Sequence, residues 1–190
     1  KTKEMDSLFN REDENGYYHP FWGNQTVEYF GEARKQEHEL DVVNGKLVHK
    51  GGVNAGTPFD TKDAFNDNSL DESAIFVMTP EGKMFASKSP ERGSIHHSSL
   101  ASGKPVASAG EMIVHDGKLI EVSNGSGHYE PSQNMNDQLF DELKERGVED
   151  KDLAYTYRSG FDDKGEEFFD LQQNRPNINP EQIPDDWMDE

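Results

Sequence analysis

Two hairpin signals constrain the fold of this chain more than any other feature. Residues 39–50 and residues 111–122 each hold two short runs of apolar and β-branched residues around an Asn-Gly or Asp-Gly dipeptide. These dipeptides favour the positive φ angles of a type I′ turn, which joins neighbouring antiparallel strands. Both segments are therefore predicted to form β-hairpins. Shared strand and turn preferences are enough to account for their likeness to each other.

A third hairpin is expected at residues 74–86, where Pro80 and Gly82 suit a turn between two apolar runs. The connection before it, residues 51–72, is rich in Gly, Asn and Asp. Long connections in compact domains often act as lids or binding loops, so this segment is a candidate for such a role.

The clearest helical pattern covers residues 133–146, where Met135, Leu139 and Leu143 recur on one face and Gly147 ends the run. An apolar stripe of this kind is typical of a helix that packs on a sheet. Together with the hairpins, it predicts an α+β domain built on an antiparallel sheet of β-hairpins with one main helix.

Changes in composition along the chain predict three parts. Residues 1–25 begin with a charged stretch and end with aromatic residues, and are predicted to be an N-terminal linker with an aromatic plug. Residues 26–158 are the expected core α+β domain. Residues 159–190 hold prolines and an acidic end, which predicts an acidic C-terminal extension.

The charge balance excludes some classes of partner. The 190 residues carry a formal net charge of −19, and a surface this acidic repels phosphate, which argues against nucleic acid as a partner. A basic protein partner, a neutral ligand and adaptation to high salt are all compatible with it. Because cysteine is absent, disulfides and thiolate zinc sites are excluded. No apolar run approaches the roughly 20 residues that span a bilayer.

The stretch best suited to chemistry is residues 95–129. It begins with histidines and serines and ends with Ser-Gly-His-Tyr, and the small residues between them allow close approach of a ligand or a second backbone. The imidazoles supply groups that titrate near neutral pH. We therefore predict that the two ends meet around one concavity and form the lips of a site. The polar residues of these ends are His96, His97, Ser98, Ser99, Ser126, His128 and Tyr129.

Metal and serine-hydrolase sites are weakly supported alternatives. If residues 95–99 are extended, His96 and His97 point to opposite faces, so only one of them faces a given pocket. One of these histidines could form a two-histidine, one-carboxylate set with Glu111 and His128, but no H-E-x-x-H spacing supports it. A serine hydrolase would need a G-x-S-x-G turn, which is absent. No metal ligand is predicted.

A nucleotide or NAD-type site is a third alternative. The polar residues at 97–99 could orient a ribose, and the small residues at 103–110 could let the ligand approach closely. Tyr129 could stack on it, and Glu111 could stabilise a developing oxocarbenium ion. A purely structural interpretation stays open beside these, because Tyr129 and His128 could hydrogen-bond to backbone and paired serines often cap strands or helices.

The motifs HHSSL at 96–100 and SGHYxP at 126–131 carry a family resemblance. At this separation they resemble the conserved domain of the plant IQ-motif calmodulin-binding proteins and their fungal and bacterial relatives. The likeness covers roughly residues 26–150. Calmodulin binding does not carry over, because the IQ motif lies outside the shared domain and the sequence has no I-Q-x-x-x-R pattern. Related segments also resemble C-terminal toxin or effector domains of bacterial secreted proteins, some of them ADP-ribosyltransferase-like.

The second resemblance implies an ADP-ribosyltransferase-like fold and a toxin or effector domain that uses NAD to modify a target-cell protein. The chain starts at Lys1 rather than Met, so we expect a secreted protein, or a part of a longer protein delivered into a target cell, and otherwise a cytoplasmic one. The expected partners are a target protein, for which basic charge would suit the acidic surface, and a cognate immunity or activator protein.

Roles for individual residues follow from the same resemblance. The expected catalytic residues are His97, Ser99, Glu111 and His128, and the expected NAD-binding residues are His96, Ser98, Gly103, Gly127 and Tyr129. The competing hypothesis is a non-catalytic recognition module that holds a peptide or small ligand in the same cleft. Whether the chain is an enzyme is left open between the two.

Overall fold

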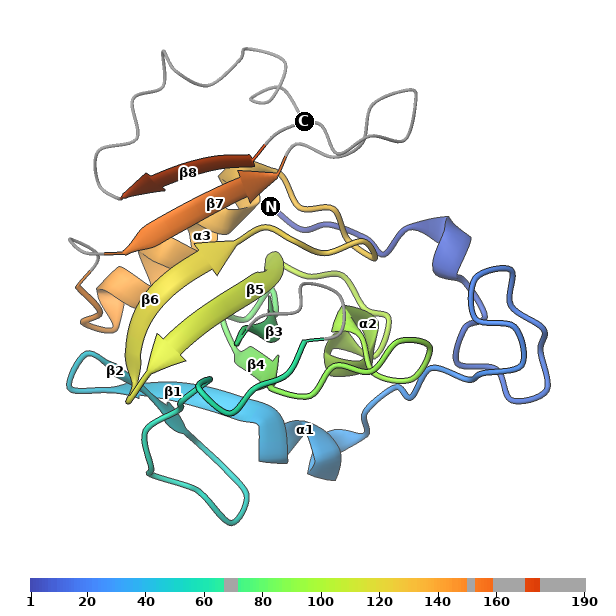
Figure 1. Cartoon of the computed structure of the whole chain (residues 1–190), viewed down its shortest axis with the longest axis horizontal. Coiled ribbons are helices and arrows are strands. Elements are labelled where there is room, and N and C mark those ends of the chain that lie inside the picture. The colour runs from blue at the N-terminus through green and yellow to red at the C-terminus, as the bar shows by residue number, and fades with distance from the viewer. Residues whose placement is uncertain (67–71, 150–152, 159–169, 175–190) are drawn as a thin grey trace.

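The computed structural model describes residues 1–66, 72–149, 153–158 and 170–174. Within these residues the strands form one eight-stranded sheet in the order β2-β1-β4-β3-β5-β6-β7-β8 (Figure 1). The strands are β1 (Glu39–Val43), β2 (Lys46–His49), β3 (Ala74–Met78), β4 (Met84–Ser87), β5 (Ser108–His115), β6 (Lys118–Ser123), β7 (Ala154–Arg158) and β8 (Asp170–Asn174). The helices are the short 3-10 helix η1 (Ser7–Phe9), α1 (Glu32–His38), α2 (His97–Ala101) and α3 (Gln133–Glu145). The prediction of an α+β domain is confirmed.

All three predicted hairpins are present. Asn44 and Gly45 join β1 to β2 with φ angles of 51° and 77°, and Asp116 and Gly117 join β5 to β6 with φ angles of 48° and 81°. Positive φ at both central residues is what a type I′ turn requires. The third hairpin pairs β3 with β4 across a turn that contains Gly82. Local turn chemistry therefore determines these three strand pairs.

The first six strands pair only antiparallel, and the sheet they form is curled. The Leu47 N–H in β2 donates to the Gly117 carbonyl in the β5–β6 turn at 2.8 Å, and the Gly117 N–H donates to the Phe59 carbonyl at 2.8 Å. These two hydrogen bonds connect β2 and the loop that follows it to the turn of the β5–β6 hairpin. The curl brings segments that lie far apart in the sequence into contact.

The strand β7 departs from the predicted antiparallel sheet, because it pairs with β6 in parallel, with Val122 opposite Tyr155. Between these two strands the chain passes through α3. A crossover of this kind returns the chain in its original direction, whereas a tight turn reverses it. The antiparallel prediction is therefore correct for β1–β6 and wrong for the β6–β7 pair.

Side chains of β3 alternate between two hydrophobic cores. Phe76 contributes to one core together with Leu139 of α3, and Ile75 contributes to the other together with Leu100 of α2. Successive strand residues point to opposite faces, so α2 and α3 cover opposite faces of the sheet. All residues of β3 are buried, as expected for a central strand covered on both sides.

The main helix α3 matches the predicted range closely. Its stripe residues Met135, Leu139 and Leu143 are all buried. Gly147 follows it with a φ of 96°, and the Val148 N–H donates to the Leu143 carbonyl at 2.9 Å. This is the hydrogen bond of a glycine-terminated helix.

Residues 97–101 form the helix α2, so the extended conformation considered for residues 95–99 is wrong. His96 is the N-cap residue, and its backbone N–H donates to Ser99 Oγ at 2.9 Å. In return, the Ser99 N–H donates to the His96 carbonyl at 3.0 Å, so the serine side chain supplies the N3 half of a capping box. Ser99 thus takes the N3 role that Glu or Gln has in most capping boxes.

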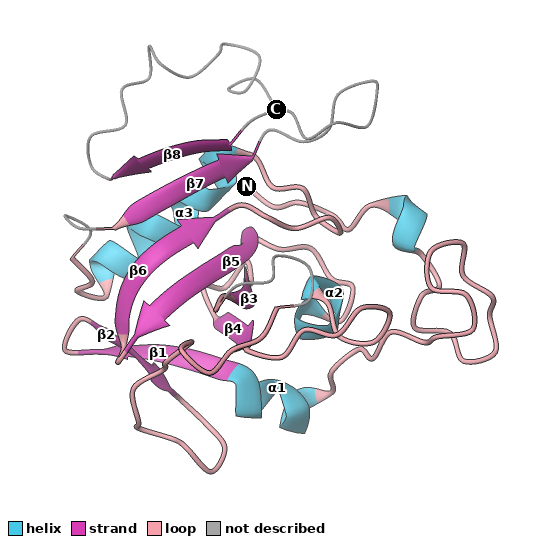
Figure 2. Cartoon of the chain, in the orientation of Figure 1, coloured by secondary structure: helices cyan, strands magenta, loops and turns pink. Residues whose placement is uncertain are grey.

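The segment predicted as a linker with an aromatic plug, residues 1–25, is mostly loop (Figure 2) and is joined to the core by hydrogen bonds. The Lys3 N–H donates to the Val106 carbonyl at 2.8 Å, and the Asp6 N–H donates to the His128 carbonyl at 2.8 Å. Its aromatic residues contact the histidines beside α2. The division into three domains stays a prediction.

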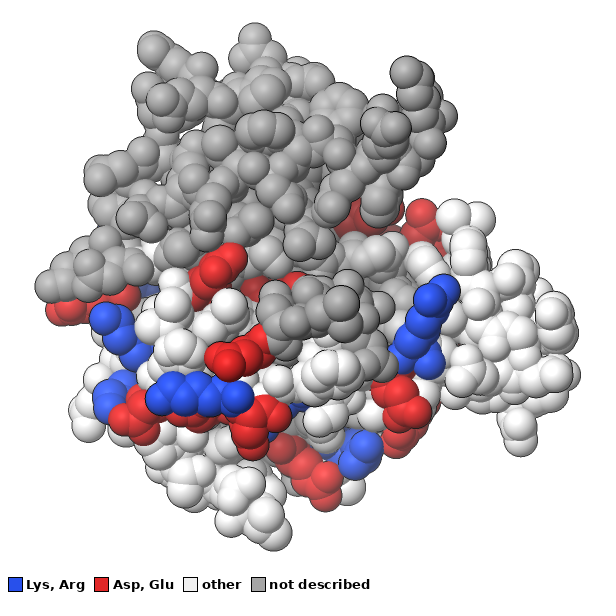
Figure 3. Space-filling model, viewed as in Figure 1, with Lys and Arg blue, Asp and Glu red and all other residues white. Residues whose placement is uncertain are grey.

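The predicted C-terminal extension, residues 159–190, lies outside the described residues except for β8. Among the described residues, every helix is too short or too polar to cross a lipid bilayer. On the face of the molecule shown in Figure 3, Lys and Arg side chains lie next to Asp and Glu side chains.

Candidate functional site

The two polar ends of the predicted site meet in space. The ring of His96, at the N-cap of α2, lies 4.9 Å from the ring of His128, in the loop between β6 and α3, measured between centroids. The two residues are separated along the chain by β5 and β6. The structure therefore brings the HHSS and SGHY motifs together, through His96 and not through His97.

The space around the two histidines is filled by the N-terminal segment. Trp22 stacks on His96 with ring centroids 4.7 Å apart, and Phe9 stacks on His128 at 3.9 Å. His96 is 6% exposed and His128 is 4% exposed. Because these rings are covered, the two motifs meet in a packed interior and not around the open concavity that was predicted. We call Phe9, Glu12, Trp22, His96 and His128 the histidine–aromatic cluster.

The Glu12 carboxylate is the charged centre of this cluster and is 1% exposed. His128 Nε2 donates to it at 2.9 Å, Trp22 Nε1 donates at 2.9 Å, and the Tyr29 hydroxyl donates at 3.1 Å. A buried carboxylate is stable only when such partners replace water. Sequence reasoning missed Glu12, because one glutamate in a charged segment carries no signal that distinguishes it from its neighbours.

Hydrogen bonding keeps Glu12 ionised. Burial alone would raise the pKa of this carboxyl, but the hydrogen bond and charge of His128, with smaller contributions from Ser98 and Trp22, lower the pKa below its usual range. The buried Ser98 hydroxyl faces the carboxylate without forming a well-aligned hydrogen bond. The cluster therefore holds an ionised carboxylate beside an imidazole that donates a hydrogen bond to it.

His96 and His97 are held neutral at physiological pH. Burial, together with the neighbouring charge of His128, lowers the pKa of His96 to about 4. The Gly93 N–H donates to His96 Nε2 at 2.9 Å, which uses the lone pair that a proton would take. Burial also lowers the pKa of His97 to about 3, and its Nε2 donates to the Gly110 carbonyl at 2.7 Å.

Burial of these two imidazoles predicts a loss of stability in acid. Because their folded-state pKa values lie below that of a free histidine, the unfolded chain binds more protons than the folded chain as the pH falls. The free energy of unfolding should therefore decrease steadily from about pH 6.5 to about pH 4. Protonation of Glu12, whose folded pKa is also lowered, should extend the loss to lower pH. Urea unfolding at a series of pH values measures this slope.

The substitution His97→Gln tests the assignment, because it removes one of the titrating groups. Its slope of stability against pH should be shallower than that of the wild type over the same range, whatever its absolute stability. An identical slope in the two proteins would show that His97 is not held neutral by burial.

The side chains of Ser99 and Tyr129 both form hydrogen bonds with backbone groups. Ser99 Oγ accepts the His96 N–H in the capping box, and the Tyr129 hydroxyl donates to the Lys104 carbonyl at 2.9 Å. Tyr129 is 1% exposed, and burial raises the pKa of its hydroxyl. The purely structural interpretation predicts such contacts with backbone for the paired serines and for Tyr129. It also predicts a backbone partner for His128, but the His128 ring hydrogen-bonds to the Glu12 carboxylate instead.

The remaining predicted site residues are Glu111, Gly103 and Gly127. Glu111, on β5, accepts from Asn66 Nδ2 at 3.0 Å. A Cβ atom on Gly103 would lie 2.6 Å from the Tyr29 ring, so this glycine is required by close packing. Gly127 has no atom within 4 Å of the position of a Cβ. In the part of the chain that the structure describes, no group of three or more His, Asp or Glu side chains is arranged to hold a metal ion.

Comparison with known proteins gives the family. A family model described as the IQ motif-containing protein middle domain matches residues 34–136. The chain belongs to this family. The IQ-motif middle domain described here is 34% identical over 124 residues to IQ domain-containing protein IQM3 of Arabidopsis thaliana, which covers 65% of this chain and 25% of that protein. It is 28% identical over 129 residues to IQM2 of the same plant, which covers 68% of this chain and 20% of that protein.

The match extends over only part of each relative. The chain spans a quarter or less of the length of the curated relatives it matches. No solved structure matches it. The predicted resemblance to plant IQ-motif proteins is confirmed, while the resemblance to bacterial toxin domains and the ADP-ribosyltransferase-like fold receive no support.

The prediction of a secreted toxin or effector with ADP-ribosyltransferase activity is wrong. The relatives that match this IQ-motif middle domain are plant IQ domain-containing proteins and not toxins or transferases. The expected target and immunity proteins are not supported either. The prediction failed for a physical reason. Small residues, hydroxyls and imidazoles are suited to an NAD site, but the same residue types also cap a short helix such as α2 and allow it to pack closely. NAD binding and cellular location stay predictions.

Proposed function

We propose that this chain is a regulatory domain in which the HHSS and SGHY motifs form a latch for the N-terminal segment. The observation that carries the proposal is the buried Glu12 carboxylate, which accepts hydrogen bonds from His128 and Trp22. The imidazoles of His96 and His128 contact Trp22 and Phe9 of the N-terminal segment. The latch residues are those of the histidine–aromatic cluster.

The latch has the properties of a two-state element. A buried ion pair contributes little net stability compared with apolar packing, but removal of one partner is strongly unfavourable because it leaves an uncompensated charge. Closure therefore depends on all partners being in place. A protein that bound the released segment, or the surface which that segment covers, would open the latch in proportion to its preference for the open state.

Membership of this family is compatible with a regulatory role but does not identify a binding partner for this chain. The relatives are named for an IQ domain, and this chain contains no I-Q-x-x-x-R pattern. We therefore propose the latch as the regulated element and assign no IQ-mediated partner to it.

Limited proteolysis with and without NAD tests the proposal. Residues 1–25 should resist cleavage in the wild type, because backbone hydrogen bonds and the cluster hold them on the core. In the E12Q variant they should be cut early while the core stays intact, since the amide cannot replace the charge that pairs with His128. NAD should alter neither pattern, and calorimetry should detect no heat when NAD is added.

The E14Q variant is the matched control, because Glu14 lies two positions away, is half-exposed and pairs with the exposed Arg11. It should be cleaved like the wild type. Early cleavage of residues 1–25 in the wild type would refute the latch. Heat of NAD binding that disappears in His97→Ala and His128→Ala would refute the regulatory assignment in favour of an enzyme.

A further inference from the structure

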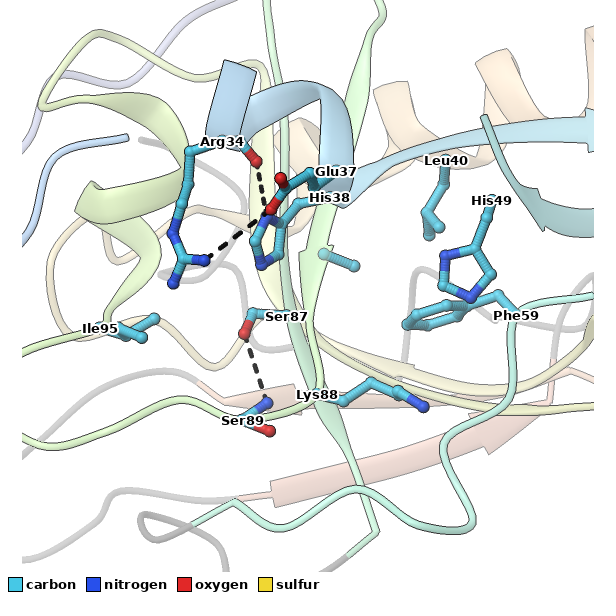
Figure 4. A pocket seen from close by; sticks show the side chains of 11 residues that line it. Arg34, Glu37, His38, Leu40, His49, Phe59, Ser87, Lys88, Ser89 and Ile95 are labelled. Carbon is cyan, nitrogen blue, oxygen red and sulfur yellow. Dashed lines mark hydrogen bonds and ion pairs between the residues drawn. The ribbon is translucent and has the colours of Figure 1, made fainter. Parts of the chain in front are cut away.

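A pocket of about 240 Å³ opens between α1, the β1–β2 hairpin and the end of β4 (Figure 4). It lies outside the histidine–aromatic cluster, and none of the cluster residues lines it. The proposed latch makes no use of it. Its lining combines a basic rim with an apolar floor.

The rim gathers positive and titratable side chains in a chain whose formal net charge is −19. Arg34 and His38 come from α1, His49 from β2, and Lys88 from the residue after β4. The one carboxylate among the lining residues is that of Glu37, which lies 3.9 Å from the Arg34 guanidinium. Two carboxylates outside the lining also pair with these cations, Glu28 with Arg34 at 3.2 Å and the exposed Asp63 with Lys88 at 2.8 Å. Exposed ion pairs are weak, so a ligand carboxylate in the pocket can take the place of Asp63 on Lys88.

The two imidazoles of the rim have different hydrogen-bond states. His38 Nδ1 donates to the Arg34 carbonyl at 2.7 Å, so Nε2 is the atom that gains a proton when this ring becomes charged. His49 packs edge-on against Phe59, with ring centroids 5.3 Å apart. Burial lowers the pKa of His49, and the charges of Lys88 and His38 lower it further. These charges therefore face His49 across the pocket.

The floor of the pocket is apolar. Leu40 and Phe59 are each 2% exposed, and Ala86 lies beside them. Next to this floor, Ser87 Oγ accepts the Ser89 N–H at 3.3 Å, which leaves the Ser87 hydroxyl hydrogen to donate to a ligand (Figure 4). A bare inorganic anion would use the rim and leave the floor in contact with water.

We propose that this pocket binds a small organic carboxylate, with its apolar body against Phe59 and Leu40 and its carboxylate between Lys88 and His49. The volume is below that of pockets for drug-sized ligands, which begin at about 300 Å³, so the ligand has roughly a dozen non-hydrogen atoms or fewer. A carboxylate gains charge-assisted hydrogen bonds from Lys88, Ser87 and a protonated imidazole.

Binding should be linked to protonation. An anion favours the charged form of His49, so it should raise the pKa that burial, Lys88 and His38 now lower. The other charged groups around the pocket are Arg34 and Glu37 of α1, which line it, and Asp63, which pairs with Lys88. The affinity should therefore increase as the pH falls from about 7.5 to about 6.

The test is a titration of the full chain with sodium benzoate, followed by nuclear magnetic resonance. Shift changes should concentrate on His38, His49, Phe59 and Lys88, with a dissociation constant on the order of 1 mM, as expected for so small a ligand. Lys88→Gln should weaken binding roughly five- to tenfold. Lys50→Gln is the matched control, because Lys50 follows His49 but pairs with Glu39 and does not line the pocket, and it should leave the affinity unchanged.

Three results would overturn the proposal. One is the absence of shift changes in the pocket at both pH values. A second is equal weakening by Lys88→Gln and Lys50→Gln, which would mean that general surface charge and not the pocket attracts the ligand. The third is inorganic phosphate binding at the same residues as tightly as benzoate, since the apolar floor would then contribute nothing.

Discussion

Replacing Glu12 with alanine is expected to lower the free energy of unfolding by about 3–5 kcal/mol, the range found when one partner of a buried ion pair is removed. The substitution leaves His128 Nε2, Trp22 Nε1 and the Tyr29 hydroxyl without their acceptor. His128 Nε2 would then be buried without a hydrogen bond, which is costly in a water-excluded interior. The partly buried Trp22 would lose its acceptor, and the Tyr29 hydroxyl would keep only Met5 Sδ at 3.4 Å. Urea unfolding followed by circular dichroism measures the change.

Glu14→Ala is the control for this experiment. Glu14 is half-exposed and pairs with Arg11, so its removal should change the free energy of unfolding by less than about 1 kcal/mol. Comparable effects of the two substitutions would mean that Glu12 acts as an ordinary surface charge, and the structure of the cluster would then be wrong.

Replacing Gly110 with alanine should have an effect at least as large, above about 3 kcal/mol. A Cβ atom at this position would lie 1.8 Å from the Ser123 carbonyl oxygen of the neighbouring strand. Backbone cannot move aside as a side-chain tip can, so β5 and β6 would have to separate. The same shift would disturb the Gly110 carbonyl, which accepts the hydrogen bond from His97. Thermal unfolding monitored by calorimetry would record the loss.

Gly31→Ala provides the comparison, because no atom lies within 4 Å of the position of its Cβ and its φ of −74° suits any residue. Gly31 is the N-cap residue of α1, where alanine is less favourable than glycine, so the loss should be small, about 1 kcal/mol or less. A Gly110→Ala variant that is as stable as the Gly31→Ala variant would contradict the close approach of β5 to Ser123.

The parts of the fold that sequence predicts are those set by local chemistry. Asn44-Gly45 and Asp116-Gly117 specify their turns whatever surrounds them. The apolar stripe of α3 predicts which face of that helix is buried. The parallel pairing of β7 could not be predicted in the same way, because it depends on the path that the chain takes through α3. The same holds for α2, where an imidazole takes the capping position usually held by Ser, Thr, Asp or Asn.

The sequence predicts that the two motifs meet around an open concavity, and the structure brings them together in a packed cluster instead. The motifs show by their residue types that His96 and His128 belong to a polar constellation, and the structure places their rings in contact. What covers them could not be inferred, because Glu12 and His128 are 116 positions apart in the sequence. The residues that decide between a pocket and a packed cluster thus lie in a segment without any pattern.

Hydrogen exchange at the Asp6 and Val27 amides tests the latch most directly. These amides donate to the carbonyls of His128 and Glu12, at opposite ends of the N-terminal segment. If the latch is closed in solution, both should exchange as slowly as amides of the central strand β3, and both should become fast in E12Q while β3 stays protected. Exchange in the wild type at the rate of an exposed loop would contradict the account, because the N-terminal segment would then not be held on the domain.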